Sequence, residues 1–222
     1  VWNTLYQLKE RGFDPQIIMD VGAFNGNWTK DCQRIYKHSK YYLIEPQYGL
    51  KNELEKMEND KIIYENLLLG SDDGVIVDFY VSGTSSSILK FDFSKPTKRK
   101  TTSMDTLCTN SNISKIDLLK LDVQGYELEI LKGAKDILKR TSLIITEVSL
   151  IEVYEDCPLV SKIVEYFDTI DFQLFDIVDF RRRELDNSLW QCDMFFIRKN
   201  HQILFDKRKD KKHQRPKTII KY

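Results

Sequence analysis

Four acidic residues stand at the ends of apolar stretches that read as buried strands, namely Asp20, Glu45, Asp122 and Glu147. The carboxyl ends of parallel strands open onto one crevice of an α/β sheet, so we expect these carboxylates to converge there. Any one of them could instead be an ordinary helix cap or a solvated turn residue. Four acids in corresponding positions favour a binding or catalytic site.

A turn punctuated by glycines follows the first of these acids. A nicotinamide-binding fold prefers Gly-x-Gly-x-x-Gly, which places a pyrophosphate on a helix N-terminus. Here the pattern is Asp-x-Gly-x-x-x-Gly. The acid would repel a pyrophosphate and suits a cofactor with positive character such as S-adenosylmethionine. We expect this cofactor to lie against Asp20, Gly22, Ala23, Phe24, Asn25, Gly26 and Trp28.

Two further features of the expected cofactor site follow from residue type. The glycines at 22 and 26 would let the ligand approach the backbone amides, which a side chain would prevent. Glu45 is placed to accept two hydrogen bonds from a ribose diol. It could do the same for NAD, so it does not discriminate between the two cofactors.

The elements that position these residues alternate between strand and helix. Strands are expected at 17–20, 41–44, 61–69, 116–121, 142–146, 172–178 and 193–197. Helices are expected around 2–8, 28–35, 50–57, 128–138 and 163–170, with Asn25 or Asn27 capping the second. This order predicts an α/β, Rossmann-like, mostly parallel sheet with helices on both faces and an antiparallel strand at its edge.

Residues 75–102 interrupt this order with short alternating runs. They suggest a hairpin or small antiparallel patch inserted between the parallel strands. Within it, residues 95–100 are expected to form an exposed basic loop, and Ser85 to Ser87 either to turn the hairpin or to bind substrate. Such insertions often carry function.

Length and composition fit one domain, at 1–200, followed by a basic tail at 201–222. The 34 basic and 34 acidic residues cancel, so no overall field favours nucleic acid or membrane. The four cysteines are far apart and suggest reduced thiols. No apolar stretch is long enough to span a membrane, and no signal-peptide core is visible. We therefore expect a soluble, cytoplasmic protein.

Several motifs together resemble the FkbM family of S-adenosylmethionine-dependent methyltransferases. They include Asp20-Val21-Gly22-Ala23, Ile44-Glu45-Pro46, Gly83-Thr84-Ser85-Ser86-Ser87, Thr101 to Leu107, Leu119 to Glu127, Glu147-Val148-Ser149 and Gln191 to Phe196. The stretch 120–133 is the most specific of them. The resemblance implies a seven-stranded class I methyltransferase sheet and O-methylation of sugar hydroxyls in polysaccharides and natural products.

Methyl transfer to a hydroxyl needs a group that takes up the hydroxyl proton. Asp122 is the first candidate base and also lines the expected cofactor site, with Glu147 and Asp193 as further catalytic candidates. The alternative roles are structural, since Asp122 could cap the next helix and Asp193 could anchor a hairpin. Converging carboxylates could also hold a divalent cation, although we predict no metal site.

Two other functions remain open at this point. The basic stretches 95–100 and 207–217 would suit an RNA 2′-O-methyltransferase, but they lack interleaved aromatic residues. A non-catalytic scaffold that keeps the cofactor fold is the second alternative. We favour a small-molecule or glycan acceptor over nucleic acid and expect no membrane partner, and the sequence does not indicate an oligomeric state.

Overall fold

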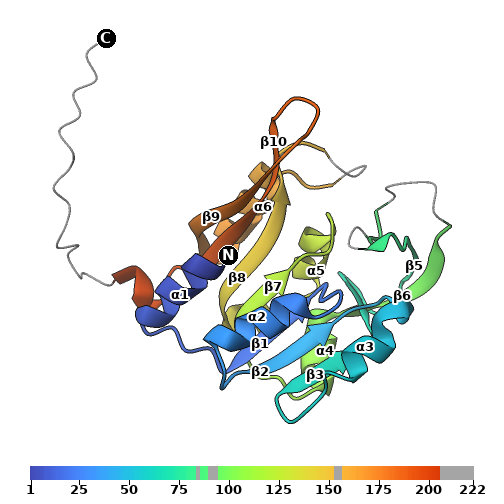
Figure 1. Cartoon of the computed structure of the whole chain (residues 1–222), viewed down its shortest axis with the longest axis horizontal. Helices are drawn as coiled ribbons and strands as arrows, with labels where there is room; N and C mark the ends of the chain where they lie inside the picture. The colour runs from blue at the N-terminus through green and yellow to red at the C-terminus, as the bar shows by residue number, and fades with distance from the viewer. Residues whose placement is uncertain (84–85, 90–94, 153–156, 206–222) are drawn as a thin grey trace.

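A seven-stranded sheet in the order β3-β2-β1-β7-β8-β10-β9 forms the centre of the computed structural model (Figure 1), which describes residues 1–83, 86–89, 95–152 and 157–205. The strands are β1 (Ile17–Val21), β2 (Lys40–Ile44), β3 (Ile62–Glu65), β7 (Ile116–Leu121), β8 (Thr141–Ser149), β9 (Phe172–Arg182) and β10 (Leu189–Arg198). The first five pair in parallel, whereas β10 is antiparallel to both β8 and β9. The predicted α/β, mostly parallel sheet with an antiparallel edge is confirmed.

Helices cover both faces of this sheet, which explains why its central strands are mostly apolar. On one face lie α1 (Trp2–Glu10), α2 (Asn27–Ile35) and α3 (Lys51–Glu55), the last preceded by the short 3-10 helix η1 (Tyr48–Leu50). On the other lie α4 (Met104–Asn110), α5 (Glu127–Lys132), η3 (Ile137–Arg140) and α6 (Val160–Thr169). In β1, Ile18 packs into the hydrophobic core on the face covered by α1, α2 and α3, and Met19 packs into the core on the opposite face. This follows because successive side chains of a strand point to opposite faces of the sheet.

A second, three-stranded sheet stands beside the main one and contains β4 (Leu68–Gly70), β6 (Thr97–Ser103) and β5 (Ile76–Phe79) in that order. The antiparallel pair of β5 and β6 confirms the predicted insertion. Two details were wrong. The single strand expected over 61–69 divides between the two sheets, and most of the loop expected over 95–100 belongs to β6. Ser85 lies outside the described residues.

Three helix and strand ends also differ from the sequence prediction. The N-cap of α2 is Gly26, with φ +73°, instead of Asn25 or Asn27. The helix expected over 128–138 ends at Lys132. Gly133 follows it and packs tightly, since a Cβ there would lie 2.2 Å from the Gly70 carbonyl oxygen. Glu147 lies within β8 instead of after it, because β8 continues in register with β10.

The C-terminal part of the described chain adds to the hydrophobic core on the face of the sheet covered by α1, α2 and α3. The 3-10 helix η4 (Gln202–Phe205) buries Ile203, whose carbonyl oxygen accepts a hydrogen bond of 2.6 Å from Arg11. These residues were predicted to begin a basic tail; the remainder of that tail, 206–222, lies outside the described residues. Among the helices in the described ranges, none has the length and apolar character needed to cross a membrane.

Candidate active site

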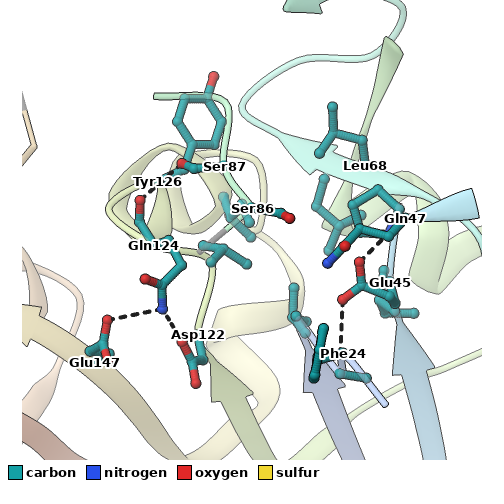
Figure 2. A pocket seen from close by; sticks show the side chains of 18 of the residues that line it. Phe24, Glu45, Gln47, Leu68, Ser86, Ser87, Asp122, Gln124, Tyr126 and Glu147 are labelled. Carbon is teal, nitrogen blue, oxygen red and sulfur yellow. Dashed lines mark hydrogen bonds between the residues drawn. The ribbon is translucent and has the colours of Figure 1, made fainter. Parts of the chain in front are cut away.

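A cavity of about 450 Å3 opens at the carboxyl ends of β1, β2, β7 and β8. This volume lies within the range of small-molecule sites, about 300–1,000 Å3. The glycine turn after β1, the end of β2 and the turn after β7 form its walls, and residues of the small sheet cover one side. Figure 2 shows Glu45 and Gln47 on one side of the pocket and Asp122, Gln124 and Glu147 on the other.

The glycine turn contributes Gly22, Ala23, Phe24 and Asn25 to the wall, and Trp28 follows from α2. The two glycines of the turn pack closely against neighbouring segments. Gly22 has φ +76°, and a Cβ on it would lie 1.9 Å from the backbone oxygen of Asp122. A Cβ on Gly26 would lie 2.5 Å from Met57 Sδ. Both glycines therefore also allow close packing, Gly22 against the residue that follows β7 and Gly26 against the segment after α3.

Glu45 directly follows β2, and its carboxylate holds the backbone around it. Oε2 accepts a hydrogen bond of 2.8 Å from the Phe24 amide, and Oε1 accepts one of 2.9 Å from the Gln47 amide. Burial raises the pKa of Glu45, and the two backbone donors oppose the rise. A carboxylate has about four acceptor positions, so this one can still accept hydrogen bonds from a diol.

Asp20 is completely buried behind the wall, because β1 continues for one residue beyond it. One carboxylate oxygen accepts a hydrogen bond of 2.7 Å from Thr29 Oγ1, and the other lies 3.2 Å from Lys120 Nζ. Lys120 Nζ also donates to the Gly22 carbonyl oxygen and lies 3.5 Å from Asp122 Oδ2. Burial alone would lower the pKa of Lys120, but the two flanking carboxylates raise it. Asp20 therefore acts on the cavity through Lys120.

Gln124 connects the two remaining acids of the cavity (Figure 2). Its Nε2 donates to Asp122 Oδ1 at 2.8 Å and to Glu147 Oε2 at 3.2 Å. Its backbone has φ +59°, and its carbonyl oxygen accepts a hydrogen bond of 2.9 Å from Ser87 Oγ of the insertion. The Asp122 side chain is 34% exposed, so part of its carboxylate faces the cavity.

Glu147 is surrounded by donors. Besides Gln124, it accepts a hydrogen bond of 2.8 Å from Gln191 Nε2 and forms an ion pair of 2.9 Å with Arg181. Burial, together with the nearby Asp122 charge, raises the pKa of Glu147 to about 8, although Arg181 opposes the rise. Arg181 also pairs with Asp193 at 3.1 Å. Asp193 is one of the residues that line a smaller adjacent cavity.

Of the residues predicted from the sequence, Asp20, Gly26 and Asp193 are absent from the wall of the main cavity, and all the others line it. Sequence reasoning missed Lys120, Gln124, Arg181 and Gln191. Lys120 carried a signal, as a charged residue inside the apolar strand 116–121. Within the described part of the chain, no three histidine, cysteine or acidic side chains are placed to hold a metal ion.

The cavity fits the chemical parts of S-adenosylmethionine. Leu67, Leu68 and Leu69 supply an apolar wall for a base near Glu45, which can bind a ribose diol. Glu45 and Asp122 place carboxyl groups on two sides of the cavity, which favours a ligand that carries positive groups. The carboxylates at the ends of the parallel strands thus suit this cofactor better than they would suit a pyrophosphate.

Comparisons with known proteins bear on the family and the fold. The 2-O-methyltransferase NoeI of Sinorhizobium fredii (strain NBRC 101917 / NGR234) is 38% identical over 165 residues, which are 64% of this chain and 66% of NoeI. This chain thus spans slightly less than two thirds of that relative.

Two solved structures of magnesium protoporphyrin IX methyltransferase (ChlM) from Synechocystis PCC 6803 share the fold at 8% identity. The structure with bound SAM has a TM-score of 0.53 and covers 89% of this chain and 77% of ChlM. The structure with bound SAH has a TM-score of 0.52, and the match covers 88% of this chain and 80% of ChlM. The model of the methyltransferase FkbM domain matches residues 20–176. The chain therefore belongs to the FkbM methyltransferase family.

Proposed function

We propose that this protein is an S-adenosylmethionine-dependent O-methyltransferase whose acceptor is a hydroxyl of a sugar. The observation that carries the proposal is the partly exposed carboxylate of Asp122, at the carboxyl end of β7 and beside a cavity of cofactor size. The similarity to a 2-O-methyltransferase supports transfer to oxygen. The sugar is what the family resemblance implies.

The cofactor would be held by residues of three elements. Glu45 would accept hydrogen bonds from the ribose, the turn at Ala23 to Asn25 would lie against the polar part, and Asp122 would lie near the positive end. When bound, S-adenosylmethionine supplies a methyl group on a positively charged sulfur. Glu45 is already fixed by two backbone amides, so the site is organised before the ligand arrives.

Asp122 would accept the proton of the acceptor hydroxyl as the oxygen–carbon bond forms and the sulfur–carbon bond breaks. The products are then a methyl ether, a neutral thioether and a protonated carboxyl group. Lys120 and Gln124 hold one oxygen each of the Asp122 carboxylate, which orients it toward the cavity. Glu147 is less suited to this role because three donors already occupy its oxygens.

The test separates cofactor binding from transfer. Calorimetric titration with S-adenosylhomocysteine should show binding to the wild type and to Asp122→Asn, because Asn keeps the size and the hydrogen bond from Gln124. Transfer of labelled methyl to fractionated glycans should fall by about 10²–10⁴ in Asp122→Asn, the usual contribution of a general base.

The Glu129→Gln variant in α5, where Glu129 pairs with Lys132, is the matched control and should keep full activity. An unimpaired rate in Asp122→Asn would remove this residue from the role of base. Cofactor binding without transfer to any acceptor would favour the scaffold alternative. No binding of the cofactor by the wild type would contradict the proposed function as a whole.

A further inference from the structure

A second cavity, of about 210 Å3, adjoins the main one. The two cavities have common wall residues, namely Trp28, Lys120, Asp122, Glu147 and Arg181. Asp122 therefore faces both spaces from the boundary between them. A group bound in the smaller cavity could present an atom to Asp122 while a larger ligand occupied the main cavity.

The side-chain cations around the smaller cavity already have acidic partners. Two of them, Lys120 and Arg181, lie in its wall. Lys120 is shared by Asp20 and Asp122, and Arg181 is shared by Glu147 and Asp193.

Four acidic side chains thus surround these two cations, and each cation already has two partners. Asp179, in the same wall, pairs separately with the amino group of Val1. An anionic group entering the cavity would find its potential cationic partners already neutralised.

The position of Arg181 follows from strand register. Asp193 of β10 lies directly opposite Glu147 of β8, so two like charges face each other across the ladder. Arg181 of β9 reaches both, at 3.1 Å and 2.9 Å. This arrangement presents guanidinium and carboxylate groups side by side, which can donate and accept hydrogen bonds to neighbouring hydroxyls.

We infer that the smaller cavity is the acceptor subsite and that it selects a neutral, hydroxyl-rich acceptor over an anionic one. The inference rests on the proposed function and adds the class of acceptor. The rings of Trp2 and Trp28, with centroids 5.9 Å apart, provide an aromatic surface in the same wall for the apolar face of a sugar ring. Uronic acids, phosphorylated sugars and RNA are then disfavoured by the same charges.

The test compares two probes that share their ring hydroxyls and differ in charge, methyl glucoside and methyl glucuronoside. Binding is measured by saturation-transfer NMR in the presence of S-adenosylhomocysteine, so the readout does not depend on turnover. We expect the glucoside to bind about tenfold or more tightly than the glucuronoside.

Asp193→Asn removes one charge but keeps an oxygen for Arg181, and should reduce this preference about threefold or more without changing the affinity for S-adenosylhomocysteine. Asp186→Asn is the matched control, since Asp186 lies in the exposed turn of the same hairpin and bonds to Ser188. It should leave the preference unchanged.

Equal binding of the two glycosides, no binding of the glucoside, or an unchanged preference in Asp193→Asn would each overturn the inference. Labelled methyl transfer into anionic glycans in preference to neutral ones would do the same. In these cases methyl transfer itself could still be intact. Absence of transfer to every hydroxyl would instead contradict the proposed function.

Discussion

Neighbouring carboxylates in the active-site region differ in how many donors surround them. Glu147 has Gln124, Gln191 and Arg181 as partners, whereas Asp122 keeps an exposed part. The sequence placed both acids at a crevice but could not rank them by environment, because Arg181 and Gln191 come from strands far away from Glu147 in the chain. Residue type indicated acid chemistry here, and the partners favour Asp122 over Glu147 as the proposed base.

Gly22 provides a test of the contact between the turn after β1 and the turn after β7. Gly22→Ala should lower the free energy of unfolding by about 2–5 kcal/mol, because Ala is strained at φ +76° and its Cβ would collide with the Asp122 carbonyl oxygen. Chemical denaturation measures this loss. Cofactor affinity should fall as well, since the turn lines the cavity.

Gly12→Ala separates strain from collision. Gly12 has φ +90° but nothing within 4 Å of its ideal Cβ position. Ala there should lower the free energy of unfolding by only about 1–2 kcal/mol and leave cofactor binding unchanged. Equal losses in the two variants would show that the contact with Asp122 contributes little.

The turn between β7 and α5 depends on a buried acid that the sequence did not single out. Glu127 Oε1 accepts hydrogen bonds from the Val123 amide at 3.0 Å and the Gly125 amide at 3.2 Å. These bonds hold the turn that carries Gln124 between Asp122 and Glu147. The sequence indicated a helix here, whereas the hydrogen bonds at its start depend on the fold of the turn.

The pKa of Glu127 leads to a prediction for stability. Burial raises this pKa from 4.5 to about 7, so the folded protein keeps a proton that the unfolded chain releases in this range. The contribution of this proton to the free energy of unfolding is complete below pH 4.5 and is lost as the pH rises to about 7. As the pH rises between those values, the free energy of unfolding of Glu127→Gln should therefore increase by about 1–3 kcal/mol relative to that of the wild type.

Urea denaturation at several pH values measures this difference. Gln keeps an acceptor oxygen for the two amides, and Glu129→Gln on the same helix is the control that should show no such trend. A constant difference between Glu127→Gln and the wild type across the pH range would contradict the prediction.

At the scale of the whole molecule, the basic stretch at 95–100 bears on the choice of acceptor. In β6, Lys98 pairs with Asp78 at 2.8 Å. Arg99 lies 4.2 Å above the ring of Tyr48 and donates a hydrogen bond to the Pro46 carbonyl oxygen. The basic stretch at 95–100 thus includes two cations that have partners within the protein.

We therefore expect weak RNA binding with little dependence on salt. Fluorescence anisotropy with a short single-stranded RNA, compared between about 50 and 200 mM salt, measures this, because each phosphate contact adds to the salt slope. A steep slope together with labelled methyl on the RNA would favour the 2′-O-methyltransferase alternative. Poly-anionic heparin serves as the control for non-specific binding.

The sequence by itself determined the α/β sheet, the antiparallel edge and the acids near the strand ends, because apolar periodicity and the residues that end strands are local properties of the chain. The tertiary structure decided which acids reach the cavity. Asp20 lies behind the wall because β1 runs one residue further, and Glu147 meets Arg181 because β8, β9 and β10 align in register. Register and side-chain direction depend on contacts between residues far apart in the chain, which no local pattern records.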